Sequence, residues 1–215
     1  MSLTFDCAEP HERALGLEAA GSAVRRGALV VLPTDTVYGL GCDAFSVPGV
    51  AALLAAKGRG RDMPVPVLVG STRTIDGLAY ELSSAARDLV QAFWPGALTV
   101  VVRAQPSLTW DLGDAAGTVA IRMPLHPVAI ELLRETGPMA VSSANRSGLL
   151  AATNVDGAID QLGDDVAVYL DGGTSGDAVP STILDMTGEV PLVLREGAIS
   201  LDLLRTVVPA LQPAR

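Results

Sequence analysis

The sequence predicts an α/β fold in which an open, mixed β-sheet is flanked by helices. Segments with strand character alternate with segments of helical periodicity along the 215 residues, and some predicted strands follow one another directly. Apolar residues make up 49% of the chain and aromatic residues only 4%, so an aliphatic core is expected. No internal repeat or Pro/Gly-rich linker interrupts the chain, and residues 1–215 are expected to form a single domain.

The predicted helices are recognised from their end residues and from apolar side chains at helical spacing. Residues 10–26 begin at Pro10, repeat apolar residues on one face and end before Gly27. A serine caps the segment 84–94. The other predicted helices span residues 47–57, 126–135, 155–162 and 201–208.

Short apolar runs bounded by turn residues predict the strands. Residues 28–32 end at Pro33, and the Gly-, Thr- and Asp-rich segment 34–45 is predicted to be a loop. Pro66 lies inside the run 65–69, which indicates an edge strand because proline cannot donate to a ladder. The other predicted strands span residues 98–102, 118–123, 139–142, 166–170, 182–186 and 191–195, with a long loop over residues 104–117.

The charge of the chain limits the classes of protein that it can represent. Its formal net charge is −9, and its 15 basic residues are 14 arginines and one lysine, Lys57. A protein that covers long stretches of nucleic acid needs a basic face, so this class is disfavoured. A local basic pocket for a small anion remains compatible with an acidic chain.

The cysteines and the N-terminal segment carry no signal for secretion. Cys7 and Cys42 show neither a disulfide framework nor metal-ligand spacing, and are expected to be reduced thiols, Cys42 near a loop. The polar, acidic N-terminus is unlike a signal peptide, and no apolar stretch reaches membrane-spanning length. We therefore expect a cytoplasmic protein with no membrane partner.

Polar clusters follow several predicted strands. They are residues 34–36, Arg122 near the end of its strand, and residues 142–145. Ligands of open α/β sheets bind outside the carboxyl ends of strands, although each cluster taken singly is more typical of ordinary turn residues. Their recurrence at several strand ends modestly favours a ligand site.

The segment 57–61, Lys-Gly-Arg-Gly-Arg, is the most specific local pattern. Lys57 ends a predicted helix, where a cation is favoured for structural reasons alone. Three cations separated by glycines exceed that need, because glycines let a ligand approach the backbone while Lys and Arg bind phosphate oxygens. The segment does not match the Walker pattern. Anion binding is favoured somewhat over a solvated turn.

Nucleophilic and metal chemistry find little support. No G-x-S-x-G elbow surrounds residues 142–145, and His11 and His126 lie at predicted helix starts, on the expected surface. So few ligands cannot build a metal site. Serine, asparagine and backbone amides of residues 142–145 are better interpreted as donors to a bound oxyanion.

Taken together, seven segments resemble the threonylcarbamoyl-AMP synthase family, which has a YrdC-like (DHBP synthase-like) fold. They lie in the family's order within residues 28–200, and the combination of K-x-R, S-x-N, PSTI and LREG is specific. The segments are LPTDTVYGLGCDAF (32–45), KGRGRDMP (57–64), FWPGALTVVV (93–102), TVAIRMPLHP (118–127), VSSANRSG (141–148), PSTILDM (180–186) and LREGAIS (194–200). The additional C-terminal domain of longer members is absent, so a short form is expected.

The resemblance implies a nucleotidyltransferase that converts L-threonine, bicarbonate and ATP into threonylcarbamoyl-adenylate and pyrophosphate. A separate transferase would move the product onto adenosine 37 of tRNAs, so at most weak direct tRNA binding is expected. ATP is implied as a substrate with Mg²⁺, for which no carboxylate cluster identifies ligands. The family's threonine-binding residues match Thr36, Arg122 and Ser181. Those that hold ATP match Lys57, Arg59, Thr118, Ser143, Asn145 and Arg195, among which Lys57, Arg59, Ser143 and Asn145 are implied to act in catalysis.

The chain also departs from the family pattern near Lys57. Many members have Asn in place of Met63, His in place of Leu68, and Pro-Ser at residues 150–151, where this chain has Leu-Ala. Two other functions stay open: an RNA-binding or ribosome-maturation module using the same cleft, and a carbamoyl-adenylate enzyme with another acceptor. The net charge and the few aromatic residues disfavour the RNA-binding module.

Overall fold

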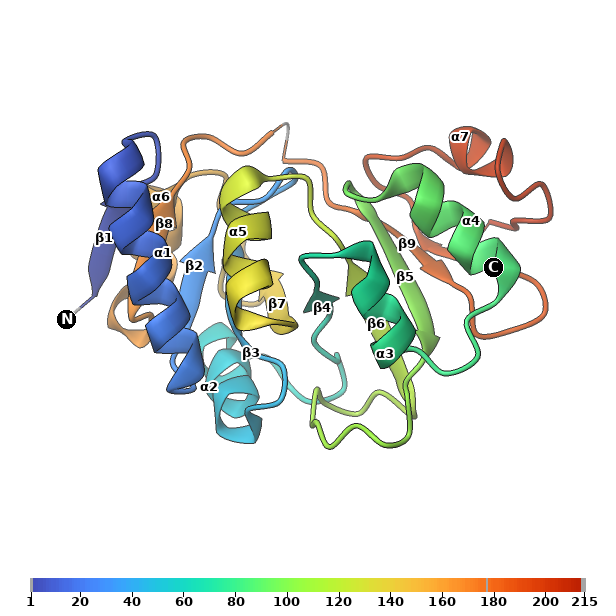
Figure 1. Cartoon of the computed structure of the whole chain (residues 1–215), viewed down its shortest axis with the longest axis horizontal. Helices are drawn as coiled ribbons and strands as arrows, with labels where there is room; N and C mark the ends of the chain where they lie inside the picture. Colours follow the sequence, from blue (N-terminus) through green and yellow to red (C-terminus); the bar gives the residue numbers. More distant parts are fainter. Residues whose placement is uncertain (1, 177, 214–215) are drawn as a thin grey trace.

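The computed structural model describes residues 2–176 and 178–213 and contains one ten-stranded sheet (Figure 1). Its strand order is β1-β8-β2-β3-β7-β4-β6-β5-β9-β10. The strands are β1 (Leu3–Asp6), β2 (Val30–Leu32), β3 (Gly39–Asp43), β4 (Val67–Leu68), β5 (Leu98–Arg103), β6 (Thr118–Arg122), β7 (Met139–Ser143), β8 (Val168–Asp171), β9 (Thr182–Asp185) and β10 (Leu192–Arg195).

The helices alternate with these strands, as the sequence predicts. The α-helices are α1 (Pro10–Arg25), α2 (Val47–Lys57), α3 (Ile75–Leu78), α4 (Ser84–Phe93), α5 (Pro127–Thr136), α6 (Val155–Leu162) and α7 (Leu201–Arg205). The sheet is mixed: β1/β8, β2/β8, β4/β6 and β5/β9 pair in parallel, and the other neighbours are antiparallel. The predicted fold class is therefore confirmed.

Two core clusters lie on opposite faces of the sheet. Side chains alternate along a strand, and in β7 the cluster of Met139 and Val141 differs from that of Ala140. The first cluster packs under α1 and α5. The second, larger cluster includes the buried side chains of α2, α4 and α6. Both contain mainly Val, Leu, Ile and Ala, as the composition predicts.

The face that α1 and α5 cover becomes polar farther along the sheet. In β6, Val119 and Ile121 belong to the larger core cluster, so Arg122 projects from the other face. By the same alternation Thr99 in β5 shares the face of Arg122. Helix α5 lies over the first half of the sheet (Figure 1). The fold thus places hydroxyl and guanidinium groups together on one sheet face.

The prediction of a loop over residues 34–45 was wrong in its second half, because Gly39–Asp43 forms β3 between β2 and β7. Glycines weaken a strand pattern in a sequence. Here they allow close packing, since a Cβ at Gly39 would lie 2.6 Å from Val141 Cγ1. Cys42 is correspondingly buried inside this strand, one residue before its end.

The edge position inferred from Pro66 was also wrong. Strand β4 lies inside the sheet between β7 and β6, and Pro66 precedes it. The Pro66 carbonyl accepts a hydrogen bond from Val141 N at 2.8 Å, so proline contributes an acceptor where no donor is required. Strand β1 was not predicted, and the last predicted helix ends at Arg205 instead of residue 208.

None of the helices within residues 2–176 and 178–213 combines the length and apolar character that crossing a membrane requires.

Candidate substrate-binding site

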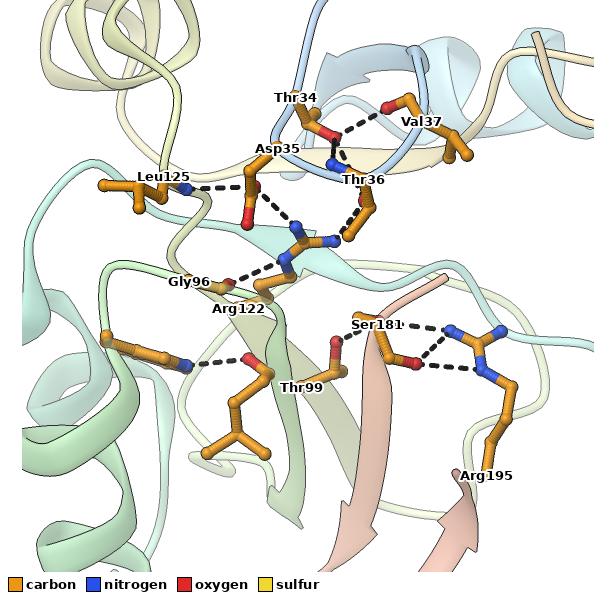
Figure 2. A network of polar contacts seen from close by, with 12 residues as sticks. Thr34, Asp35, Thr36, Val37, Gly96, Thr99, Arg122, Leu125, Ser181 and Arg195 are labelled. Atoms are coloured by element: carbon orange, nitrogen blue, oxygen red, sulfur yellow. Dashed lines mark hydrogen bonds and ion pairs between the residues drawn. The ribbon is translucent and has the colours of Figure 1, made fainter. Parts of the chain in front are cut away.

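Arg122 is the centre of a buried polar network at the end of β6 (Figure 2). Its Nε donates to Gly96 O at 3.0 Å, its Nη1 to Thr36 Oγ1 at 2.9 Å and its Nη2 to Asp35 Oδ1 at 2.6 Å. Burial lowers the pKa of Arg122, and the charge of Asp35 opposes that shift. A guanidinium has five N–H bonds, so one N–H on each Nη has no acceptor among the described residues. These two can bind a carboxylate.

The turn after β2 presents Thr36 to this arginine. The Thr34 hydroxyl donates to Val37 O at 2.6 Å and accepts from Thr36 N at 3.2 Å. It lies 3.1 Å from Thr36 Oγ1. Because the Thr34 proton is used on Val37, the Thr36 hydroxyl donates to Thr34 and keeps its own oxygen as an acceptor. Thr36 Oγ1 accepts from Arg122 and has one lone pair left for a ligand N–H.

Ser181 and Arg195 form a second group, which lies across Arg122 from the Thr34–Thr36 turn (Figure 2). Arg195 donates through Nε and Nη2 to Ser181 O, and its Nη2 also lies 3.1 Å from Ser181 Oγ. The Ser181 and Thr99 hydroxyls are 2.8 Å apart. Burial, and then the positive charge of Arg122, lower the pKa of Arg195.

Lys57 lies at the last position of α2 and is 3% exposed. Its ammonium donates to Ser143 O at 2.6 Å, Asn145 O at 2.7 Å and Asn145 Oδ1 at 3.0 Å. These acceptors favour the charged form, whereas burial and the nearby Arg59 oppose it and lower the pKa of Lys57 to about 8. All three ammonium donors are therefore directed at the turn that follows β7.

That turn, residues 143–149, is held by its own asparagine. Asn145 Nδ2 donates to Arg146 O at 3.0 Å and Leu149 O at 2.7 Å, which leaves the Asn145 side chain fully hydrogen bonded. The Ser143 hydroxyl, by contrast, has no partner in the described part of the chain. Ser143 is therefore the hydroxyl of this turn that is free to contact a ligand.

Arg59 and Thr118 are less tightly integrated. Arg59 donates to Ser142 Oγ at 3.1 Å and Pro64 O at 3.3 Å, while its buried Nε has no acceptor among the described residues. Thr118 Oγ1 donates to Ala115 O at 2.7 Å. Thr118 lines a hollow of about 360 Å³ with loop 104–117, which no other predicted site residue lines. The structure does not bring Thr118 into contact with the other predicted residues.

The region of Lys57 and the region of Arg122 are joined by the segment that runs from the Thr36 turn into β3. Tyr38 O accepts from Ala144 N at 2.8 Å, and Gly39 pairs with Ser143 in the β3–β7 ladder. The turn that carries Thr36 is therefore continuous with the strand that borders Ser143. Sequence reasoning brought both turns to strand ends, and the structure connects them.

Three participants were given no role by sequence reasoning: Asp35 and Ser142, which lie inside the predicted polar clusters 34–36 and 142–145, and Thr99, which was not noticed. Asp35 is adjacent to the predicted Thr36, and an acidic side chain at a strand end close to a predicted cation was the available signal. Thr99 interrupts an otherwise apolar strand, as a hydroxyl does when it contacts another polar group. Ser142 alternates with Ser143, and no signal in the sequence indicates which of the two accepts from Arg59.

The residues that depart from the family pattern differ in their surroundings. Leu68 is 5% exposed, packs in the core cluster under α5 and pairs with Arg122 in the β4–β6 ladder. Met63 and Leu150 are exposed. Only Leu68 therefore brings an apolar side chain next to the Arg122 network.

The histidines and cysteines lie apart from this chemistry. His126, predicted at the surface, is half-buried and its Nδ1 has no partner in the described residues; burial lowers its pKa, and Asp35 opposes that. Cys7 and Cys42 are free and buried, and burial raises their pKa values to about 11 and about 12. Among the residues described, no three His, Cys, Asp or Glu side chains gather where they could hold a metal ion.

The family model Sua5/YciO/YrdC, described as "Telomere recombination", matches residues 22–197. A Mycobacterium tuberculosis protein named "Putative threonylcarbamoyl-AMP synthase" is 61% identical over 208 residues, which cover 97% of this chain and 96% of that protein. The "Threonylcarbamoyl-AMP synthase" of Bacillus subtilis is 37% identical over 88% of this chain and 55% of its own length.

Solved structures agree with this similarity. P. abyssi Sua5 complexed with L-threonine has a TM-score of 0.91 and 30% identity, and covers 100% of this chain. This chain spans 62% of that longer protein. E. coli YciO, at 23% identity and a TM-score of 0.82, shows the same fold. The match over most of the sequence, and the relatives that span nearly all of it, establish that the chain belongs to the Sua5/YciO/YrdC family.

Proposed function

We propose that this protein is an L-threonylcarbamoyladenylate synthase, which forms threonylcarbamoyl-AMP and pyrophosphate from L-threonine, bicarbonate and ATP. The observation that carries the proposal is the Arg122 network, in which a buried guanidinium keeps two N–H groups for a carboxylate beside the acceptor Thr36 Oγ1. An amino acid offers both complementary groups, a carboxylate and an N–H. The relatives' names and the L-threonine complex of P. abyssi Sua5 support threonine as that amino acid.

The amino acid would bind with its carboxylate on Arg122 and its amine toward Thr36. Bidentate pairing of a guanidinium with a carboxylate is geometrically specific and strong. Ser181, held by Thr99 and Arg195, supplies a further hydroxyl to the site. The carbon of bicarbonate then forms a bond with the amine nitrogen and water leaves. The resulting carbamate oxygen bonds to the α-phosphorus of ATP, and pyrophosphate leaves.

ATP would be held on the side of Lys57. We propose Lys57, Arg59, Ser143 and Asn145 for this role. Arg195, which is hydrogen bonded to Ser181, and Thr118, which lies beside loop 104–117, would contact ATP from outside the Lys57 region. Lys57 and Asn145 act by fixing the turn, because their polar atoms are already hydrogen bonded to it. The free Ser143 hydroxyl is the group available to phosphate oxygens, and Arg59, whose buried Nε has no acceptor among the described residues, contributes its positive charge. Fixed positive charges around the leaving pyrophosphate would stabilise the negative charge that develops on it in the transition state.

Mg²⁺ accompanies ATP in this proposal, but this chain supplies no carboxylate cluster for it among the described residues. Mg²⁺ commonly binds through substrate phosphates and water, with one or two protein carboxylates. The metal would therefore arrive with the phosphates of ATP, and no residue is assigned to it.

The wider setting follows from the product. Threonylcarbamoyl-AMP is a reactive mixed anhydride, so a separate transferase would move the threonylcarbamoyl group onto adenosine 37 of tRNA. With a net charge of −9, the chain would make at most weak direct contact with tRNA. ATP and tRNA are cytoplasmic molecules, which supports a cytoplasmic location. The single ten-stranded sheet supports one catalytic domain over residues 1–215.

Pyrophosphate release tests the proposal. The protein is incubated with ATP and bicarbonate, with and without L-threonine, and release is expected only when threonine is present. For variants of Arg122, Arg87→Ala is the matched control, because Arg87 forms an exposed ion pair with Asp76 away from the site. Release that does not depend on threonine, or no release, would contradict the proposal. Tight, salt-dependent tRNA binding without catalysis would instead favour an RNA-binding module.

A further inference from the structure

Asp35 is the one carboxylate that contacts the proposed amino-acid site within the described part of the chain. Its Oδ1 accepts from Arg122 Nη2 at 2.6 Å and from the backbone N–H of Leu125 at 2.9 Å (Figure 2). Its side chain is 15% exposed and that of Arg122 is 8% exposed. A single carboxylate oxygen thus joins the turn after β2, the end of β6 and the segment leading into α5.

The orientation of the Arg122 guanidinium is set by three acceptors. Gly96 O and Thr36 Oγ1 are neutral, and Asp35 Oδ1 is the only charged one. Hydrogen bonds to ionised groups are shorter and roughly twice as strong as neutral ones. Asp35 therefore contributes the largest share of the force that fixes the plane of the guanidinium, and with it the direction of the two unused N–H bonds.

Asp35 also balances the positive charge of Arg122. Arg122 and Arg195 repel each other, and Asp35 is the only acid in salt-bridge contact with either guanidinium among the residues that the structure describes. Without Asp35 the buried guanidinium of Arg122 would keep only its two neutral acceptors, Gly96 O and Thr36 Oγ1.

We propose that Asp35 is a positioning residue for amino-acid recognition, which aims the free N–H groups of Arg122 at the substrate carboxylate. The inference rests on the proposed function, because it names a residue for the same amino-acid site. Asp35 acts through Arg122, so its removal should affect threonine and leave ATP binding on the Lys57 side unchanged. A merely structural ion pair would not make that distinction between the two substrates.

Asp35→Ala and Asp35→Asn test the proposal, with Asp76→Asn as the matched control. The asparagine variant retains an oxygen for Arg122 and the Leu125 N–H but loses the charge, whereas the alanine variant loses both. Asp76 forms an exposed ion pair with Arg87 at 2.7 Å and touches no site residue. For each protein, L-threonine binding is measured by calorimetry, the KM values for threonine and ATP by pyrophosphate release, and the melting temperature by circular dichroism.

Asp35→Ala is expected to raise the Kd and KM for L-threonine by about tenfold or more, since small misplacements of a binding group are costly. The KM for ATP should stay within about twofold, and Asp35→Asn should recover part of the loss. Unchanged threonine binding in both variants overturns the proposal. Tighter binding of L-threonine by Asp35→Asn also overturns it, because Asp35 would then only repel the substrate carboxylate. A parallel rise of the KM values for threonine and ATP, together with a lower melting temperature, overturns it as well.

The same measurements separate this inference from the function on which it rests. A wild-type protein that neither binds L-threonine nor releases pyrophosphate in its presence overturns the proposed function and removes this inference with it. A wild-type protein that does both, together with Asp35 variants that behave like Asp76→Asn, overturns only the role of Asp35.

Discussion

Lys57 and Arg122 are both buried cations, but the chain satisfies them in opposite ways. Lys57 donates to two carbonyl oxygens and an amide oxygen and has no carboxylate in contact among the described residues. Arg122 donates to a carboxylate, a hydroxyl and a carbonyl, and keeps two N–H bonds. Lys57 therefore uses all its N–H donors but has no negative charge beside it. Arg122 has the negative charge of Asp35 beside it but keeps two unused N–H donors. Lys57 is suited to act on a polyanion by its field, and Arg122 to bind a carboxylate by direct contact.

Arg122→Ala should produce the largest effect, because it removes one partner of a buried ion pair. Breaking such a pair typically costs about 3–5 kcal/mol of unfolding free energy, since the remaining charge is left buried. Threonine-dependent pyrophosphate release should be lost as well. Urea denaturation and the release assay check both effects. Arg122→Lys should restore little, because one ammonium cannot match three acceptors in the guanidinium geometry. A stable, active Arg122→Ala protein would contradict the central role of this side chain.

Lys57→Met sharpens the comparison, because methionine fills the space of the lysine stem without its charge or donors. Three acceptors lose a partner, and leaving buried polar groups unsatisfied costs about 1–3 kcal/mol each. Turnover at limiting ATP should fall by about 10²-fold, as when one preorganised electrostatic contact is removed. Calorimetric binding of threonine should change little. If Lys57→Met weakened threonine binding as much as Arg122→Lys does, the two cations would not have separate roles.

The pH dependence of stability tests the uncompensated charge of Lys57. Burial and Arg59 lower its pKa from 10.5 to about 8, so the folded state disfavours the proton. Below about pH 8 Lys57 is charged in both the folded and the unfolded state, so the full free-energy cost of burying its charge is present. Between about pH 8 and 10.5 the unfolded state binds more protons than the folded state, so stability rises with pH. The gain at the upper end is about 3 kcal/mol.

This gain is isolated as the difference in unfolding free energy between wild type and Lys57→Met. The raised pKa values of Cys7 and Cys42 act in the opposite direction at alkaline pH, but they are common to both proteins and cancel. The difference should move in favour of wild type from about pH 8 to about pH 10. A constant difference over that range would show that Lys57 keeps an ordinary pKa.

The sequence predicted the cations and hydroxyls of the candidate site but not the contacts among them. Motif order placed Lys57 and Arg122 at a helix end and a strand end, where the structure has them. Which acceptors each one meets depends on chain pairing, which local patterns do not encode. Gly39–Asp43, invisible as a strand because of its glycines, is the element that brings the Thr36 turn beside Ser143. Asp35 lies in the predicted polar cluster 34–36, but its role follows only from its contact with Arg122.

The same limit explains the errors in the fold. Proline and glycine are read as strand breakers because they lack a donor or a side chain. In this protein Pro66 precedes a strand interior to the sheet, and Gly39 and Gly41 permit close approach to Val141. Helix α2 was predicted to the residue, since its apolar run and the stop at Gly58 are local signals. Features fixed by local chemistry were predictable, whereas those fixed by a distant strand were not.

Thr99→Val should produce the smallest effect and tests whether the Arg122 side extends to its supporting hydroxyls. Thr99 is 3% exposed and its hydroxyl lies 2.8 Å from that of Ser181, while valine has nearly the same shape. Losing one such hydrogen bond costs about 1 kcal/mol, which corresponds to roughly a fivefold rise in the KM for threonine if Ser181 becomes less ordered. The KM for ATP should change less, because Thr99 has no contact with the Lys57 turn and reaches Arg195 only through Ser181. Thr206→Val is the control, since the exposed Thr206 hydroxyl donates to Leu203 O at 2.7 Å away from the site. Equal KM values for threonine in the two variants would confine the amino-acid site to Arg122 and Thr36. A rise in the KM values of both threonine and ATP in Thr99→Val would show that the Arg122 and Lys57 regions are not independent.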